Sequence, residues 1–270
     1  MQVDHWPSKS KFAALSKSFS AFADPAPALT FNLDHTQQNL YNALNSRYLT
    51  NAYTFEIELI DSDDPTITRT VDVPCNFTFH QLHHVLLCGF AWMNSHMHKF
   101  SFEGKGKCVE ISGDEPMFDD IPTLDEKQVK LSDIFDASGC HRSKVLQDGG
   151  LLPLVYEYDF GDSWEHFIEF KGEKEIDVNR PVFTAATGYP PAEDCGGMMG
   201  WDRVKAAFAE KKPDGEEREL REWAIELMAK PDGSDPFWPT KRKYNPLKEV
   251  DLKVLNSARR WNQITNMDYY

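Results

Sequence analysis

The sequence predicts an α+β fold, in which antiparallel hairpins form a sheet and amphipathic helices pack against it. Residues 53–59 and 67–73 alternate apolar and polar side chains around an Asp- and Pro-containing turn, which predicts a β-hairpin. A second hairpin is predicted at residues 154–160 and 163–170, because Gly161 suits the positive φ of a tight turn. Other segments carry apolar residues at helical spacing, so helices are expected beside the strands.

The helix that follows Thr78 has the best-defined start signal. Thr78 and Gln81 have the spacing of a capping box, in which each side chain hydrogen-bonds the other residue's free backbone N–H. The apolar stripe then continues through Leu82, Val85, Leu86 and Phe90. Further helices are expected at residues 34–48, at residues 131–135, around Trp201, Val204 and Phe208, and from Asp214 to Lys230.

The chain is expected to form one core domain with additions at both ends. We expect residues 1–50 to be a partly helical N-terminal extension, residues 51–256 to be the α+β domain, and residues 257–270 to be a C-terminal tail. Strands are also expected at residues 96–102 and 108–112, on either side of a glycine turn. Residues 171–195 contain three prolines and are expected to be irregular.

Composition and charge narrow the classes of function. The 43 acidic and 29 basic residues give a net charge of -14, whereas proteins that grip phosphates are usually basic. No run approaches the roughly 20 apolar residues of a membrane span, and the first residues lack an apolar signal sequence. The five cysteines lack the spacing of a structural zinc site. We therefore expect a cytoplasmic protein with free thiols and no membrane partner.

The second hairpin concentrates acidic and aromatic residues. A two-residue loop at Gly161 and Asp162 would pair Glu157 with His166 and Asp159 with Trp164. One face would then carry Glu157, Asp159, Trp164 and His166, and the other Tyr158 and Glu165. Two carboxylates beside a histidine suit acid–base chemistry or metal binding. The alternative is a solvent-exposed face with a cross-strand Glu–His pair.

Five histidines fall within residues 80–98. Their spacing differs from the HExxH pattern, so a helical zinc pair is not indicated. His83 lies beside the apolar stripe and is expected either to be a core residue or to support a residue that binds a ligand. His96 and His98 would share one strand face, from which they could reach the second hairpin.

A loop at residues 190–197 brings together Glu193, Asp194 and Cys195. The two glycines that follow precede a helix, and their N–H groups could bind an anion or a carbonyl oxygen. An ordinary capping loop is the alternative. Cys195 would act as a nucleophile only beside a base, which the sequence does not reveal.

Three segments together point to one known family. Residues 156–166 read Tyr-Glu-Tyr-Asp-Phe-Gly-Asp-Ser-Trp-Glu-His, and residues 190–197 read Pro-Pro-Ala-Glu-Asp-Cys-Gly-Gly. The third segment contains Leu82-His83, Ala91-Trp92, His96-Met-His98 and Phe100. These segments resemble the plasmid pRiA4b ORF-3-like family, whose hallmark is Tyr-x-Tyr-Asp-Phe-Gly-Asp-x-Trp-x-His. The chain departs from the family pattern at Ala91, which replaces a glycine, and at residues 65–70, which lack a Trp and one Arg.

The resemblance implies an α+β fold with an antiparallel sheet and says little about a reaction. The domain is also similar to fungal enzymes that make arginine-containing cyclodipeptides from aminoacyl-tRNA. Their activity is associated with an Asp-x-x-Glu pattern, which Asp162 and Glu165 match. Such an enzyme would use aminoacyl-tRNA and an amino-acid substrate, and carboxylates would hold the guanidinium group. Its place would be in secondary metabolism.

The expected site follows from these residues. We expect catalytic roles for Asp159, Asp162, Glu165 and His166. We expect substrate contacts from Glu157, Tyr158, Trp164, His83, His96, Glu193, Asp194 and Cys195. The tRNA would bind Lys241, Arg242 and Lys243, although the net negative charge counts against it. No metal and no cofactor are expected. The alternatives are a non-catalytic accessory of a mobile element and a metal-dependent hydrolase that uses His and Asp.

Overall fold

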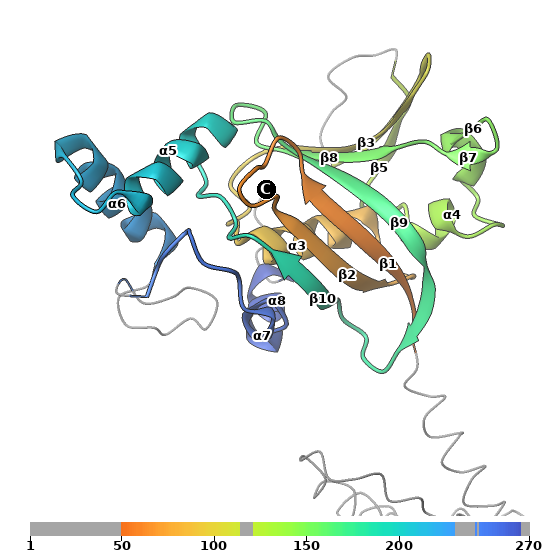
Figure 1. The fold of residues 1–270 in the computed structure, drawn as a ribbon. Helices are drawn as coiled ribbons and strands as arrows, with labels where there is room; N and C mark the ends of the chain where they lie inside the picture. The colour runs from red at the N-terminus through yellow and green to blue at the C-terminus, as the bar shows by residue number, and fades with distance from the viewer. Residues whose placement is uncertain (1–49, 114–120, 230–240, 242, 266–270) are drawn as a thin grey trace, which may run out of the picture. The chain divides into compact units, whose positions relative to one another are not determined.

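The computed structural model describes residues 50–113, 121–229, 241 and 243–265 (Figure 1). The predicted helix at residues 34–48 and the N-terminal extension lie outside the described residues, apart from Thr50. The described chain forms a mixed, mostly antiparallel eight-stranded sheet in the order β10-β2-β1-β9-β8-β3-β4-β5. The expected α+β fold is therefore confirmed.

The strands of the main sheet come from both halves of the described chain. They are β1 (Thr50–Leu59), β2 (Thr68–Pro74), β3 (His98–Gly104), β4 (Lys107–Ser112), β5 (Thr123–Asp125), β8 (Leu154–Tyr158), β9 (Trp164–Ile176) and β10 (Val182–Thr187). A separate hairpin consists of β6 (Leu146–Gln147) and β7 (Gly150–Leu151). Between β4 and β5 the pairing is parallel, and the other paired strands of the main sheet are antiparallel.

The first predicted hairpin is confirmed, but the length of β9 was not predicted. β1 pairs with β2 and, on its other side, with β9 along its whole length, from Thr50 opposite Ile176 to Leu59 opposite His166. The distal half of β9 has little apolar character of its own. Its backbone is held by the ladder with β1, a long-range pairing that local periodicity does not report. Residues 182–187 add β10 to the edge, so the expectation of an irregular segment at 171–195 is wrong there.

Helix α3 (Phe79–Phe90) packs in the hydrophobic core against the sheet. Its capping box forms as predicted between Thr78 and Gln81. Phe79 contacts Phe100 of β3, with the ring centroids 5.2 Å apart in an edge-to-face arrangement. The helix ends at Ala91, which adopts a left-handed conformation with φ of 64°. The chain thereby turns sharply toward the loop that carries His96.

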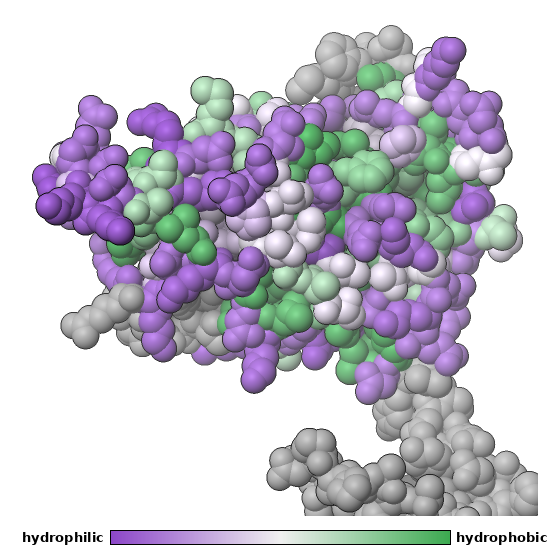
Figure 2. All heavy atoms as spheres, in the orientation of Figure 1, coloured by the Kyte–Doolittle hydropathy of each residue, from purple (hydrophilic) through white to green (hydrophobic). Residues whose placement is uncertain are grey.

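The remaining helices are α4 (Leu131–Phe135), the 3₁₀ helix η1 (Arg142–Val145), α5 (Gly197–Ala209), α6 (Gly215–Met228), α7 (Leu252–Leu255) and α8 (Ala258–Thr265). α4, α5 and α6 confirm predicted helices, and Asp214 caps α6 through a capping box with Glu217. α5 and α6 contact each other and carry mostly hydrophilic side chains on the face seen in Figure 2.

The segment expected to be a C-terminal tail includes α8, which packs against α3. The Phe77 and Trp261 rings stack with centroids 5.7 Å apart, and Ile264 is buried. Arg260 is also buried, and its guanidinium donates a hydrogen bond to the Trp92 carbonyl oxygen. Arg260 is thus a core residue and not a surface charge.

Candidate functional site

The second hairpin has a different register from the predicted one. Trp164 pairs with Tyr158 and His166 pairs with Tyr156, which leaves residues 159–163 as the connection. Asp159 and Ser163 both have positive φ, and the Ser163 N–H donates to the Asp159 carbonyl oxygen. The Asp159 carboxylate accepts hydrogen bonds from the backbone N–H groups of Gly161 and Asp162. This five-residue turn is closed by Asp159, whose side chain bonds the backbone two residues on, as Asp commonly does in turns.

The shifted register moves His166 into the core. Its ring lies edge-on to Phe90 at a centroid distance of 4.3 Å, and it is fully buried. Burial lowers the pKa of His166 to about 3, so the ring is neutral at physiological pH. The expected pairing of His166 with Glu157 is wrong, because β-strand alternation now places them on opposite faces. A catalytic role of His166 stays a prediction. Trp164 is buried on the same inner face as His166.

The outer face of this hairpin carries Glu157 and Glu165 directly opposite each other. The Lys99 ammonium lies 3.1 Å from a Glu110 carboxylate oxygen and 3.7 Å from one of Glu157. Glu165 is exposed. The Asp162 carboxylate instead accepts a hydrogen bond from the Gly196 N–H at 3.1 Å. The two acidic residues of the Asp-x-x-Glu pattern therefore lie in different surroundings.

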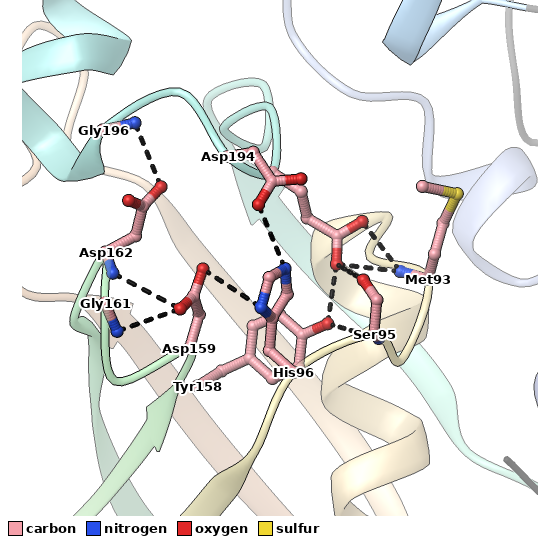
Figure 3. Close-up of polar contacts among 10 residues, drawn as sticks. Met93, Ser95, His96, Tyr158, Asp159, Gly161, Asp162, Asp194 and Gly196 are labelled. Atoms are coloured by element: carbon pink, nitrogen blue, oxygen red, sulfur yellow. Dashed lines mark hydrogen bonds and ion pairs between the residues drawn. The ribbon is translucent and has the colours of Figure 1, made fainter.

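Three loops meet beside this turn, and we call their meeting point the three-loop site (Figure 3). The loops are residues 91–97 after α3, residues 159–163 between β8 and β9, and residues 188–196 between β10 and α5. His96 lies between the other two loops. Its Nδ1 is 3.5 Å from Asp159 Oδ2, and its Nε2 is 3.3 Å from Asp194 Oδ1. One ligand atom from each of these residues lies within 4.8 Å of the other two.

The buried carboxylate of Glu193 holds the three loops together. It accepts hydrogen bonds from the Tyr158 hydroxyl at 2.6 Å, the Met93 backbone N–H at 3.1 Å and the Ser95 hydroxyl at 3.4 Å. Tyr158 precedes Asp159, Ser95 precedes His96, and Glu193 precedes Asp194. Through these bonds Glu193 holds the residues that precede Asp159 and His96, and it is itself joined to Asp194.

Burial raises the pKa of the Glu193 carboxyl, although the hydrogen bonds that it accepts oppose this shift. Burial and, to a smaller extent, the charge of Glu193 also raise the pKa of Tyr158. The phenol therefore stays protonated and donates a hydrogen bond to the Glu193 carboxylate. The sequence marked both residues as substrate contacts. In the structure they are buried beneath the site and support its backbone.

The backbone of the three-loop site is unusual at several positions. Asn94, Asp159 and Asp194 have φ values of 61°, 59° and 59°, in the left-handed region that residues other than glycine rarely adopt. Each of the three loops thus contains at least one such residue, and Ala91 and Ser163 add a second to two of them. Asn and Asp tolerate this conformation better than most residues, and left-handed non-glycine residues tend to gather at functional sites.

The other four histidines of residues 80–98 form a separate group beside Glu126. Glu126 bridges His80 Nδ1 at 2.7 Å and His98 Nε2 at 2.8 Å. Burial would raise the pKa of Glu126, but the hydrogen bonds from both histidines outweigh it and hold the pKa well below its usual range. The His98 ring stacks on His83 at 3.5 Å. His83 is buried, as its place beside the apolar stripe predicted. Its ring nitrogens hydrogen-bond Tyr156 and Asn94.

The loop that carries Cys195 and Gly196 packs onto the β8–β9 turn. Burial raises the pKa of the Cys195 thiol to about 12, so it stays protonated and is a weak nucleophile. The Gly196 N–H is already bonded to Asp162, so it is not available to an anion. A substrate contact from Cys195 and an anion contact from the Gly197 N–H stay predictions.

The predicted tRNA contacts are only partly described. Lys241 forms an ion pair with Glu226, and Lys243 is exposed. Arg242 lies outside the described residues. A role of these residues in binding tRNA stays a prediction.

Comparison with known proteins places the chain in a family. The family model described as Plasmid pRiA4b ORF-3-like protein matches residues 51–236, which span both the sheet and the three-loop site. The chain belongs to the plasmid pRiA4b ORF-3-like family. It is 32% identical over 154 residues to the uncharacterized protein y4hQ of Sinorhizobium fredii, a match that covers 56% of this chain and 70% of that protein.

The same fold occurs in a solved structure. The protein of unknown function MM3350 from Methanosarcina mazei Go1 has a TM-score of 0.56 and 23% identity, over 76% of this chain and 97% of that one. In this pRiA4b ORF-3-like protein, the two longest motif segments contribute Asp159 and Asp194 to the three-loop site. No helix in the described part of the chain is long and apolar enough to cross a membrane.

Proposed function

We propose that this protein is a metal-dependent hydrolase, in which His96, Asp159 and Asp194 bind a divalent cation. One observation carries the proposal: three donor atoms, delivered by three separate loops, lie within 4.8 Å of one another. Donor atoms bound at about 2.1 Å to a common ion are at most about 4.2 Å apart. A pair of donor atoms 4.8 Å apart would have to close by at least about 0.6 Å to bind the same ion.

The contacts of His96 support an ion more than a set of hydrogen bonds. Its distances of 3.3 and 3.5 Å to the two carboxylates exceed the 2.7–2.9 Å that is typical of charge-assisted hydrogen bonds. Among the described residues, no hydrogen-bond partner is found for its buried Nε2. Two donors that share one ion lie about 3.0 to 3.4 Å apart, for angles between octahedral and tetrahedral. The Nε2 to Asp194 distance falls in this interval.

The donor set also suits catalysis. One imidazole and two carboxylates are ligands for Mn²⁺, Zn²⁺ or Fe²⁺, and three protein ligands leave positions for water and substrate. The Asp194 side chain is 63% exposed, so the open side of the site faces solvent. A bound cation would lower the pKa of its water and polarise a substrate carbonyl. The water oxygen would attack the carbonyl carbon, the bond to the leaving group would break, and that group would take a proton.

Direct metal binding tests the proposal without knowledge of the substrate. We expect the purified protein, after treatment with a chelator, to bind one equivalent of Mn²⁺ in a titration followed by electron paramagnetic resonance. Asp194→Asn should weaken binding at least about tenfold without unfolding the protein, because this side chain is exposed. Glu165→Gln, on the outer sheet face, is the matched control and should bind normally. No binding of Mn²⁺ or Zn²⁺, or equal binding by both variants, would refute the proposal.

Aminoacyl transfer from tRNA, as in fungal cyclodipeptide synthases, is the second candidate. The observation that favours it is the excess of carboxylates at the three-loop site, which suits a guanidinium or amine substrate. Untargeted metabolite profiling of an expressing host separates the candidates: a new cyclodipeptide would favour transfer over hydrolysis. A non-catalytic accessory role predicts neither a product nor a bound ion.

A further inference from the structure

Exposed methionines occur in the loop at residues 91–97 and in the first turn of α5, next to segments of the three-loop site. Met93 is 39% exposed, Met97 51% and Met199 82%. The Met93 N–H binds Glu193, and the Met97 carbonyl oxygen accepts the Asp159 N–H at 2.9 Å. Figure 3 shows Met93 beside Ser95 at one margin of the site. We call these three residues the methionine rim.

Met199 belongs to the same margin through the start of α5. It lies in the first turn, two residues after Gly197. A Cβ on Gly197 would lie 2.8 Å from the Asp162 carbonyl oxygen, so this turn is in tight contact with the β8–β9 connection. The only other large hydrophobic residues that are exposed in the described chain are Phe167, Trp223 and Leu247. Three of the six exposed large hydrophobic residues of the described chain thus belong to segments next to the proposed metal centre.

The same margin is acidic. In the described part of the chain, no Lys or Arg forms an ion pair with Asp159, Asp162, Glu193 or Asp194. Lys99, at the neighbouring strand, is already engaged by Glu110 and Glu157. A divalent ion would offset the charges of Asp159 and Asp194, but that of Asp162 would remain. This field disfavours phosphorylated and carboxylate-rich substrates and favours cationic ones.

We infer that the substrate is a peptide in which an apolar residue lies next to a basic one, and that the methionine rim binds the apolar side chain. Methionine is flexible and polarisable, and such side chains adapt to varied apolar ligands. The rim comes from the loop at residues 91–97 and from the first turn of α5, so two separate segments of the chain offer contacts beside the bond that reacts. A peptide that runs across the proposed metal centre can use these contacts, whereas a small molecule that binds only at the ion cannot. This inference rests on the proposed hydrolase function.

Hydrolysis of synthetic peptides by the Mn²⁺-loaded protein tests the inference. We expect peptides with a Leu-Arg pair to be cleaved with a kcat/KM at least about tenfold above matched Leu-Glu peptides, with the difference shrinking at high salt. The double variant Met97→Gln, Met199→Gln should raise KM for the Leu-Arg peptide about tenfold and leave kcat and Mn²⁺ affinity unchanged. Leu247→Gln removes an exposed apolar residue elsewhere and serves as the control.

The possible failures are distinguishable. Equal cleavage of Leu-Glu peptides would overturn the charge preference, and an unchanged KM in the double variant would overturn the role of the rim. If Mn²⁺ binds at His96, Asp159 and Asp194 but no peptide is cleaved, the substrate class is wrong while the metal centre stands. If no metal binds, the proposed function itself fails, and this inference fails with it.

Discussion

Replacing Glu193 with alanine should both destabilise the protein and weaken its metal site. The substitution leaves the buried Tyr158 hydroxyl and the Met93 N–H without their acceptor, and it removes the longer contact with Ser95. A hydrogen bond to a charged group contributes about 1.5–3 kcal/mol. The two shorter bonds together suggest a loss of about 3–6 kcal/mol in the free energy of unfolding. For a domain of this size, that corresponds to a fall in Tm of roughly 6–24 °C.

The effect on the site should be separable from the effect on stability. Glu193 fixes the neighbours of all three proposed ligands, and the loss of such supporting contacts typically lowers metal affinity about 10- to 100-fold. Glu193→Gln keeps the size and one acceptor oxygen, so it should retain most of the stability and an intermediate affinity. Urea denaturation and Mn²⁺ titration at a temperature where both variants are folded measure the two quantities. An alanine variant with the wild-type Mn²⁺ affinity would refute the role of Glu193, whatever its Tm.

Three further outcomes are expected. Gly200→Ala should lower Tm and weaken Mn²⁺ binding, because the added Cβ would overlap the Cys195 carbonyl oxygen and displace the loop of Asp194; a normal affinity would contradict this. The pKa of Glu126 is depressed in the folded protein, so its contribution to the free energy of unfolding should be complete above its unfolded pKa of about 4.3 and shrink as the pH falls below that value. The difference in unfolding free energy between wild type and Glu126→Gln, measured against pH, checks this sign. Burial raises the pKa of Cys195 to about 12, so iodoacetamide at neutral pH should modify the exposed Cys140 before Cys195, as peptide mass spectrometry would report.

Much of the secondary structure follows from contacts between near neighbours in the chain. The β1–β2 hairpin was predictable because alternation over residues 53–59 and 67–73 encodes which side chains face the core. The starts of α3 and α6 were predictable because a capping box depends on residues three positions apart, such as Thr78 and Gln81. The family motif also marked the loops that form the site, since it includes Asp159 and Asp194.

The site itself depended on long-range packing. His96, Asp159 and Asp194 are far apart in the chain, and only the convergence of three loops brings their side chains together. The register of β8 and β9 turned on Asp159, which adopts positive φ and closes the turn with its own carboxylate. A shift of one residue reverses the face of every side chain in a strand, and that reversal buried His166. Local sequence patterns set which segments become strands and helices, whereas burial and loop packing set which polar groups meet, because those energies depend on neighbours that are distant in the chain.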